Sequence, residues 1–150
     1  MLAGCEEPGP GCQNCRVTAD SGSGLETGVS VLVVDDQAPF RAAAKAVVAA
    51  TPGFHVVAEA TSGEQALEVV TALGPRLVLM DINMDGISGI EATRRIHAEH
   101  PESRVILLST YDAEDLPADA MTCGAIAYIH KEQFGPDVLD EEWRQAQALP

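Results

Sequence analysis

The sequence predicts an α/β fold in which a five-stranded parallel sheet, in the order 2-1-3-4-5, carries helices on both faces. Three observations support this prediction. Short apolar runs rich in Val, Ile and Leu recur along the chain, segments with helical spacing of apolar residues separate them, and Gly or Pro residues mark most breaks. Strands that alternate with helices in this way are joined by right-handed crossovers and therefore run parallel.

The length and composition allow one domain with an aliphatic core and a short extension. The chain has 150 residues, of which 46% are hydrophobic and only 4% are aromatic. No apolar run reaches the roughly 20 residues that would span a bilayer. With no signal peptide before the domain, we expect a cytoplasmic protein that does not associate with membranes.

The first strand and helix follow an abrupt change of texture at Val29. Val29–Val34 is an apolar, largely β-branched run that ends in two aspartates, which is typical of a buried strand. Pro39 suits the first turn of a helix, which Ala42–Ala50 continue with strong helix formers. Pro52-Gly53 ends this helix.

The second strand–helix unit occupies residues 54 to 75. Phe54–Ala60 is read as a strand, and Thr61 or Ser62 can cap the next helix. Its apolar residues, at helical spacing, are Ala66, Leu67, Val70 and Leu73. Gly74-Pro75 ends it.

The remaining elements repeat the pattern three times. The predicted strands are Leu77–Met80, Val105–Leu108 and Ala125–Ile129, and the predicted helices are Ile87–Glu99, a weaker Ala113–Cys123, and Val138–Ala148.

Residues 1–28 differ from the domain at 29–150. They are rich in Gly, Pro, Ser, Cys and Glu without a hydrophobic period, so we expect a disordered tail, or a start codon assigned too early. Cys5, Cys12 and Cys15 lie close together, and Cys12 and Cys15 have the C-x2-C spacing of a zinc or redox pair, but a closed four-ligand site lacks an obvious fourth ligand. Cys123 stands in an apolar stretch, which predicts a small buried side chain.

The formal charge of −14 argues against direct binding to nucleic acid, which requires a basic surface. Acidity of this size is compatible with simple solubility. It is also compatible with a cluster of carboxylates at one site.

Such a cluster is predicted at the carboxyl edge of the sheet, where parallel strands of this order place their ligand sites. The residues that follow the strands are Asp35 and Asp36 after the first, Asp81 after the third, Ser109 and Thr110 after the fourth, and Lys131 after the fifth. Three adjacent carboxylates repel one another and need a cation, and hard oxygen ligands suit Mg²⁺. One Asp carboxylate could then accept a phosphoryl group, with the metal and Lys131 offsetting its charge.

Two other interpretations apply to the same residues. Acidic and hydroxyl residues after strands often serve only as helix caps or turn formers. A Mg²⁺-dependent phosphohydrolase of related architecture would typically carry a D-x-D motif after its first strand, which Asp35-Asp36-Gln37 does not supply.

Four segments of the sequence resemble the motifs of a known protein family. They are VLVVDD (Val31–Asp36), LVLMDINMDGISGIEA (Leu77–Ala92), VILLST (Val105–Thr110) and AYIHKE (Ala127–Glu132). On these segments the chain, from residue 29 to about 148, resembles the receiver domain of two-component response regulators. Within that family it resembles the branch usually fused to helix-turn-helix DNA-binding domains. The resemblance implies a flavodoxin-like receiver fold.

The resemblance also implies a role for each site residue. Asp81 would be the phosphoacceptor, and Asp36, Asp81 and the Asn83 carbonyl would ligate Mg²⁺, with Asp35 acting through a bound water. Lys131 and Ser109 would contact the phosphoryl oxygens. Tyr128 would turn inward when Ser109 is drawn toward the phosphate, although a strand aromatic packed on the sheet surface is the alternative.

The chain departs from the family pattern at two positions. Asp85 replaces the usual Pro after Met84, which adds a carboxylate near the loop, and Glu132 replaces the Pro that usually follows the lysine. In addition, Asn83 and Tyr111 occupy the positions that flank the attacking water in the family. The bulk of Tyr111 predicts slow loss of the phosphoryl group.

The resemblance implies signal relay rather than turnover of a substrate. We expect a sensor histidine kinase or phosphotransfer protein to phosphorylate Asp81, with no enzyme activity beyond self-phosphorylation and self-dephosphorylation. Because the sequence ends at Pro150, we expect a stand-alone receiver whose output is a downstream protein partner, onward phosphotransfer or a phosphorylation-dependent homodimer. The alternative is a phosphorylation-independent interaction module with the same fold.

Overall fold

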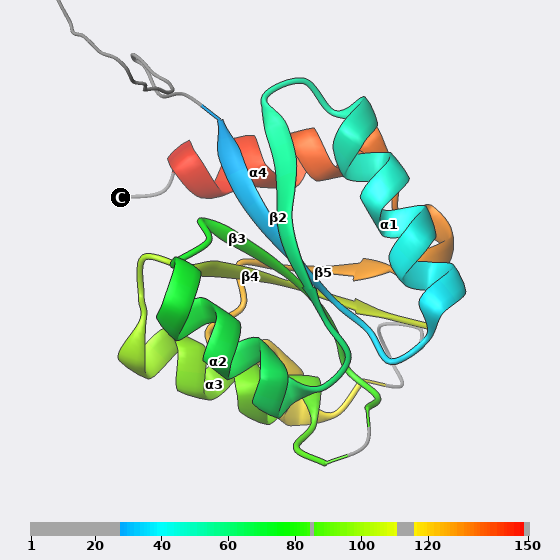
Figure 1. Cartoon of the computed structure of the whole chain (residues 1–150). Coiled ribbons are helices and arrows are strands. Elements are labelled where there is room, and N and C mark those ends of the chain that lie inside the picture. Colours follow the sequence, from blue (N-terminus) through cyan, green and yellow to red (C-terminus); the bar gives the residue numbers. More distant parts are fainter. Residues whose placement is uncertain (1–27, 85, 111–115, 149–150) are drawn as a thin grey trace, which may run out of the picture.

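The computed structural model describes residues 28–84, 86–110 and 116–148, without the side chains of Met121 and Ala148. They form one parallel sheet of five strands in the order β2-β1-β3-β4-β5, with helices on both faces (Figure 1). The sequence-based prediction of fold class and strand order is therefore confirmed. The elements, in chain order, are β1 Val29–Val34, α1 Ala38–Ala50, β2 Phe54–Ala60, α2 Gly63–Leu73, β3 Leu77–Asp81, α3 Gly89–Glu99, β4 Arg104–Ser109, η2 Ala118–Met121, β5 Ala127–His130, η3 Lys131–Gln133 and α4 Pro136–Ala148.

Each face of the sheet has its own hydrophobic core. Helices α1 and α4 cover one face, where Val48 and Leu139 are fully buried, and α2 and α3 cover the other, around Ile96 (Figure 1). Strand β3 lies at the centre, and all five of its residues are buried. Burial on both faces explains why the strands read as continuous apolar runs rather than as alternating ones.

Local signals set the helix boundaries. The Ser62 hydroxyl accepts a hydrogen bond from the backbone N–H of Gln65 at 3.1 Å and caps α2, and Ser88 caps α3 in the same way. Helix α2 ends at Gly74, whose φ of 57° lies in the left-handed region that glycine adopts without strain. Because Ser88 is the N-cap of α3, this helix begins at Gly89, two residues later than predicted from the sequence.

The predicted helix Ala113–Cys123 is wrong as a continuous element. Among residues 116–123, which the structure describes, only the short 3-10 helix η2 forms. Pro117 precedes η2, and a proline ring disfavours helical backbone in the residue before it. A helix therefore cannot continue through Leu116 into η2.

No helix within the described ranges is long and apolar enough to cross a membrane.

Cys123 is 2% exposed, which confirms the prediction of a buried side chain, and its thiol donates to the carbonyl oxygen of Ala120 at 3.6 Å.

Candidate functional site

The first two acidic residues leave β1 in opposite environments. Asp35 is fully buried, and its Oδ1 accepts a hydrogen bond from the backbone N–H of Gln37 at 2.8 Å. Asp36, the next residue, is exposed. Successive residues that leave a strand point to opposite sides, so one carboxylate enters the crevice and the other lies at its rim.

Asp81 is the last residue of β3 and lies at the centre of the same edge. Its side chain is almost fully buried, and its Oδ1 lies 3.4 Å from the backbone nitrogen of Asn83, which donates to it. The backbone after Asp81 is held against the start of α3, because the N–H of Gly89 donates to the carbonyl of Ile82 at 3.0 Å. The tight loop keeps the carboxylate at the edge of the sheet.

Lys131 links the two buried carboxylates from the end of β5. Its Nζ lies 2.7 Å from Asp35 Oδ2 and 3.3 Å from Asp81 Oδ1. The ammonium also lies 4.3 Å from the centre of the Phe40 ring, at the first turn of α1. This ring covers the cation and offers it the negative face of its π system.

The three carboxylates are close enough to share one ion. Asp35, Asp36 and Asp81 each offer an oxygen, and these oxygens all lie within 4.8 Å of one another. Carboxylate oxygens from a partly open cluster, with water completing the shell, are the donor set that Mg²⁺ prefers. The residues present therefore fit a magnesium ion.

The pKa of Asp81 is raised from its ordinary value to about 6. Burial is the largest cause because it penalises the charged form, and the negative charge of Asp35 acts in the same direction. Lys131 and the Asn83 N–H oppose the shift. In the absence of a cation, the site therefore carries unfavourable negative charge.

Ser109 and Tyr128 lie on the neighbouring strands β4 and β5. Ser109 is the last residue of β4 and is 1% exposed, next to the edge that carries Asp81. Tyr128 pairs in register with Leu107, is half-buried and packs against the core on the α2–α3 face. A small cavity of about 130 Å³ adjoins it, lined also by Ala120, Ala125, Ile126 and Ala127.

The structure brings together Asp35, Asp36, Asp81 and Lys131 as the sequence predicted, and it also includes residues that sequence reasoning missed. Phe40 was overlooked as a contact of the lysine, although an aromatic one turn into the helix that follows the acidic pair was an available signal. Gly89 was also overlooked, because its role is a close backbone approach that no local pattern reveals.

Some predictions concern residues outside the described ranges. These are the tail with Cys12 and Cys15, the effect of Asp85, and the shielding role of Tyr111. They remain predictions from the sequence.

Comparison with known proteins connects this geometry to a family. A response regulator receiver domain model matches residues 31–143. The chain is 37% identical over 115 residues to the transcriptional regulatory protein DegU of Brevibacillus brevis, which covers 77% of this chain and 49% of that protein. The chain thus spans about half the length of the curated relatives that it matches.

Solved structures of receiver domains have the same fold as this chain. The response regulator domain of Thermotoga maritima CheB superposes with a TM-score of 0.72 at 30% identity, covering 82% of this chain and 99% of that one. The signal receiver domain of the putative response regulator NarL of Mycobacterium tuberculosis gives a TM-score of 0.75 at 26% identity, covering 83% of this chain and 100% of that one. The sheet order, the acidic edge with its lysine, and these matches together show that the chain belongs to the response regulator receiver family of two-component signalling.

Proposed function

We propose that residues 29–150 receive a phosphoryl group on Asp81 from a sensor histidine kinase or a phosphotransfer protein, with Mg²⁺ as cofactor. One observation carries this proposal. Three carboxylates share a space within 4.8 Å, and Lys131 contacts two of them. Neither helix capping nor solubility accounts for two buried carboxylates that are bridged by a single ammonium.

The arrangement supports an in-line transfer to Asp81. A carboxylate oxygen of Asp81 forms a bond to phosphorus as the bond between phosphorus and the donor's imidazole nitrogen breaks, and the released imidazole takes up a proton from solvent. Lys131 moves from the carboxylates to the new phosphoryl oxygens, and the Ser109 hydroxyl donates to one of them. Bound Mg²⁺ would supply positive charge that offsets the negative charge of the carboxylates and of the phosphoryl group. Asp36, Asp81 and the Asn83 carbonyl would ligate it directly, and Asp35 through water.

The proposed output is a change in a protein-binding surface. Movement of Ser109 toward the phosphoryl group would vacate space that the Tyr128 ring can enter, and the cavity beside this ring supports such a movement. The face that changes would comprise η2, β5 and α4. Its readers would be a downstream protein, an acceptor in onward phosphotransfer, or a second copy of the chain.

We further propose that residues 29–150 accept the phosphoryl group as a stand-alone receiver, because all of the site residues lie within this range. The proposed chemistry is limited to self-phosphorylation and self-dephosphorylation. The proposed compartment is the cytoplasm. Direct contact with nucleic acid is not part of the function of these residues. The net charge of −14 supports this, as does the pairing of six of the eight described Lys and Arg side chains with carboxylates.

The test is phosphorylation by acetyl phosphate with Mg²⁺, followed by intact mass spectrometry and a gel that retards phosphoproteins. We expect one phosphoryl group on the wild-type chain and on Asp137→Asn, which removes an exposed aspartate outside the cluster. Asp81→Asn should lose the modification. Equal labelling of Asp81→Asn would refute the site.

The phosphorylation-independent alternative predicts a different result. Under that alternative, acetyl phosphate and beryllofluoride leave partner capture unchanged, and Asp81→Asn captures the same proteins as wild type. A partner set that changes with beryllofluoride in the wild type and not in Asp81→Asn would support the switch.

A further inference from the structure

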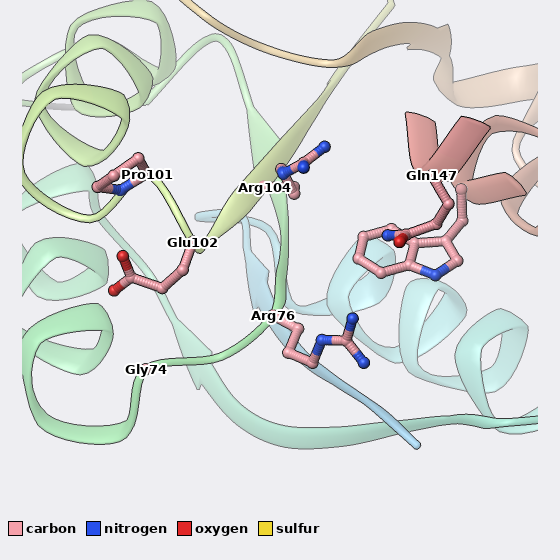
Figure 2. Close-up of a pocket in the computed structure, with 7 residues that line it drawn as sticks. Gly74, Arg76, Pro101, Glu102, Arg104 and Gln147 are labelled. Carbon is pink, nitrogen blue, oxygen red and sulfur yellow. The ribbon is translucent and has the colours of Figure 1, made fainter. Parts of the chain in front are cut away.

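A groove of about 310 Å³ lies at the opposite edge of the sheet from the carboxylates, and Figure 2 shows the residues that line it. It opens where α2 leads into β3 and α3 leads into β4, and the last turn of α4 forms its other side. Its size is at the lower end of the range for small-molecule sites. The lining residues are Gly74, Arg76, Pro101, Glu102, Arg104, Trp143 and Gln147.

The two arginines of this groove differ from every other lysine and arginine that the structure describes. Of the eight Lys and Arg side chains in the described ranges, the other six each form an ion pair with a carboxylate; they are Arg41, Lys45, Arg94, Arg95, Lys131 and Arg144. Arg76 and Arg104 form no ion pair with any described residue. The chain has a net charge of −14, and the two arginines without an ion pair in its described part therefore line the same groove.

The backbone holds the two arginines next to each other. The N–H of Arg104 donates to the carbonyl of Arg76 at 2.9 Å, where β4 begins beside β3, and the N–H of Arg76 donates to the Ser30 hydroxyl at 3.0 Å. The start of each strand is therefore fixed. The Glu102 side chain extends away from the guanidinium groups of Arg76 and Arg104 (Figure 2).

The ring of Trp143 orients the guanidinium group of Arg76. The Arg76 guanidinium carbon lies 5.6 Å from the centre of the Trp143 ring, and Trp143 is itself held edge-on against Phe54, with ring centres 6.1 Å apart. A guanidinium that lies over an indole ring is partly ordered before any ligand binds, and its N–H groups stay available for hydrogen bonds. Gln147 adds an amide that can both donate and accept on the α4 side.

We propose that this groove binds a small phosphorylated metabolite, with its phosphate monoester held by Arg76 and Arg104 and its polar body against Gln147. Two guanidinium forks match the oxygens of a dianion better than those of a single carboxylate, since each fork can donate two parallel hydrogen bonds. The polar walls disfavour a purely apolar ligand. The groove is separate from the phosphoacceptor site, so the inference does not depend on transfer to Asp81.

A purely structural role for the arginines makes a different prediction. The groove adjoins the carboxyl ends of α2 and α4, whose partial negative charge a nearby cation can offset. No hydrogen bond from either guanidinium to a helix carbonyl exists among the described residues, so their donors remain available. If the arginines served only to offset helix ends, a phosphate ester would find no site.

Trp143 is the chain's single tryptophan, so its fluorescence reports directly on the groove. We would titrate the intact protein with ribose 5-phosphate, at constant ionic strength and with EDTA, and use unphosphorylated ribose as the ligand control. We expect a saturable change with ribose 5-phosphate and none with ribose. Arg104→Gln should weaken binding by about tenfold, equivalent to about 1.4 kcal/mol.

The matched control is Arg95→Gln, which removes the same charge from an exposed arginine on α3. It should leave the affinity within about twofold, since distant exposed charges are screened. Arg104→Lys keeps the charge without the fork, and it should bind with intermediate affinity. The absence of a saturable change in the wild type, or equal weakening in Arg95→Gln and Arg104→Gln, would overturn the proposal.

Discussion

Gly89 at the start of α3 is in direct backbone contact with Asp81. A Cβ atom at position 89 would overlap the carbonyl oxygen of Asp81 and lie 2.9 Å from the Cα of Ile82. The helix can approach the end of β3 this closely only because residue 89 has no side chain. The packing of α3 and the position of the proposed phosphoacceptor are therefore set by the same contact.

Gly89→Ala should destabilise the protein by about 2–4 kcal/mol, because either α3 or the end of β3 must move. Gly135→Ala is the control, since a Cβ there meets nothing within 4 Å and its φ is not positive. That variant should change stability by less than about 0.5 kcal/mol. Urea unfolding of both variants checks the prediction, and equal free energies of unfolding would contradict it.

Lys131→Gln should cost at least about 2 kcal/mol in metal-free protein, because two buried carboxylates lose the cation that they share. Lys45, the only other lysine in the chain, pairs with Glu59 at an exposed site. Lys45→Gln should cost less than about 1 kcal/mol, as exposed pairs contribute little. A loss of stability in Lys131→Gln no larger than in Lys45→Gln, measured in EDTA, would show that Lys131 does not stabilise the buried pair.

Asp81→Asn should stabilise the metal-free protein at neutral pH. The folded pKa of Asp81 is raised to about 6 from 3.8, so the native state binds the proton more tightly than the unfolded state does. The native state loses stability as pH rises from about 4 to about 6, and this cost is fully present above pH 6. The gain from Asp81→Asn should be about 2 kcal/mol larger at pH 7.5 than at pH 4.5.

Urea titrations of wild type and Asp81→Asn in EDTA at both pH values check this prediction. Asp137→Asn, on the exposed surface, is the control and should show no such dependence. A gain that is independent of pH would contradict the raised pKa.

Magnesium should raise the free energy of unfolding of the wild type in proportion to the logarithm of its concentration above the dissociation constant. Asp36→Asn should reduce this stabilisation strongly, because the exposed carboxylate completes the cluster of three. Glu68→Gln, on the exposed face of α2, should leave it unchanged. The measurement is the melting temperature across a Mg²⁺ series, and a series in which Asp36→Asn behaves as wild type would exclude Asp36 as a ligand.

Several features could be predicted from the sequence because they depend on short-range patterns. The apolar runs that end at Val34 and Met80 predict buried strands, and the residues that follow each strand are placed by the parallel topology at a single edge. The shared edge of Asp35, Asp36, Asp81 and Lys131 is therefore predictable from the sequence alone. The helix predicted over residues 113–123 was wrong because the prediction rested on residue composition and did not weigh the local effect of Pro117.

By itself, the sequence determined the alternation of strands and helices, and hence which acidic residues and which lysine share an edge. The tertiary structure alone decided how those residues are paired: Lys131 lies closer to Asp35 than to Asp81, and it lies over the ring of Phe40. It alone also placed Arg76 and Arg104 in one groove with Trp143. The physical reason is that local periodicity fixes which side of an element a residue occupies, whereas distances between residues far apart in the chain depend on how the helices and strands pack together.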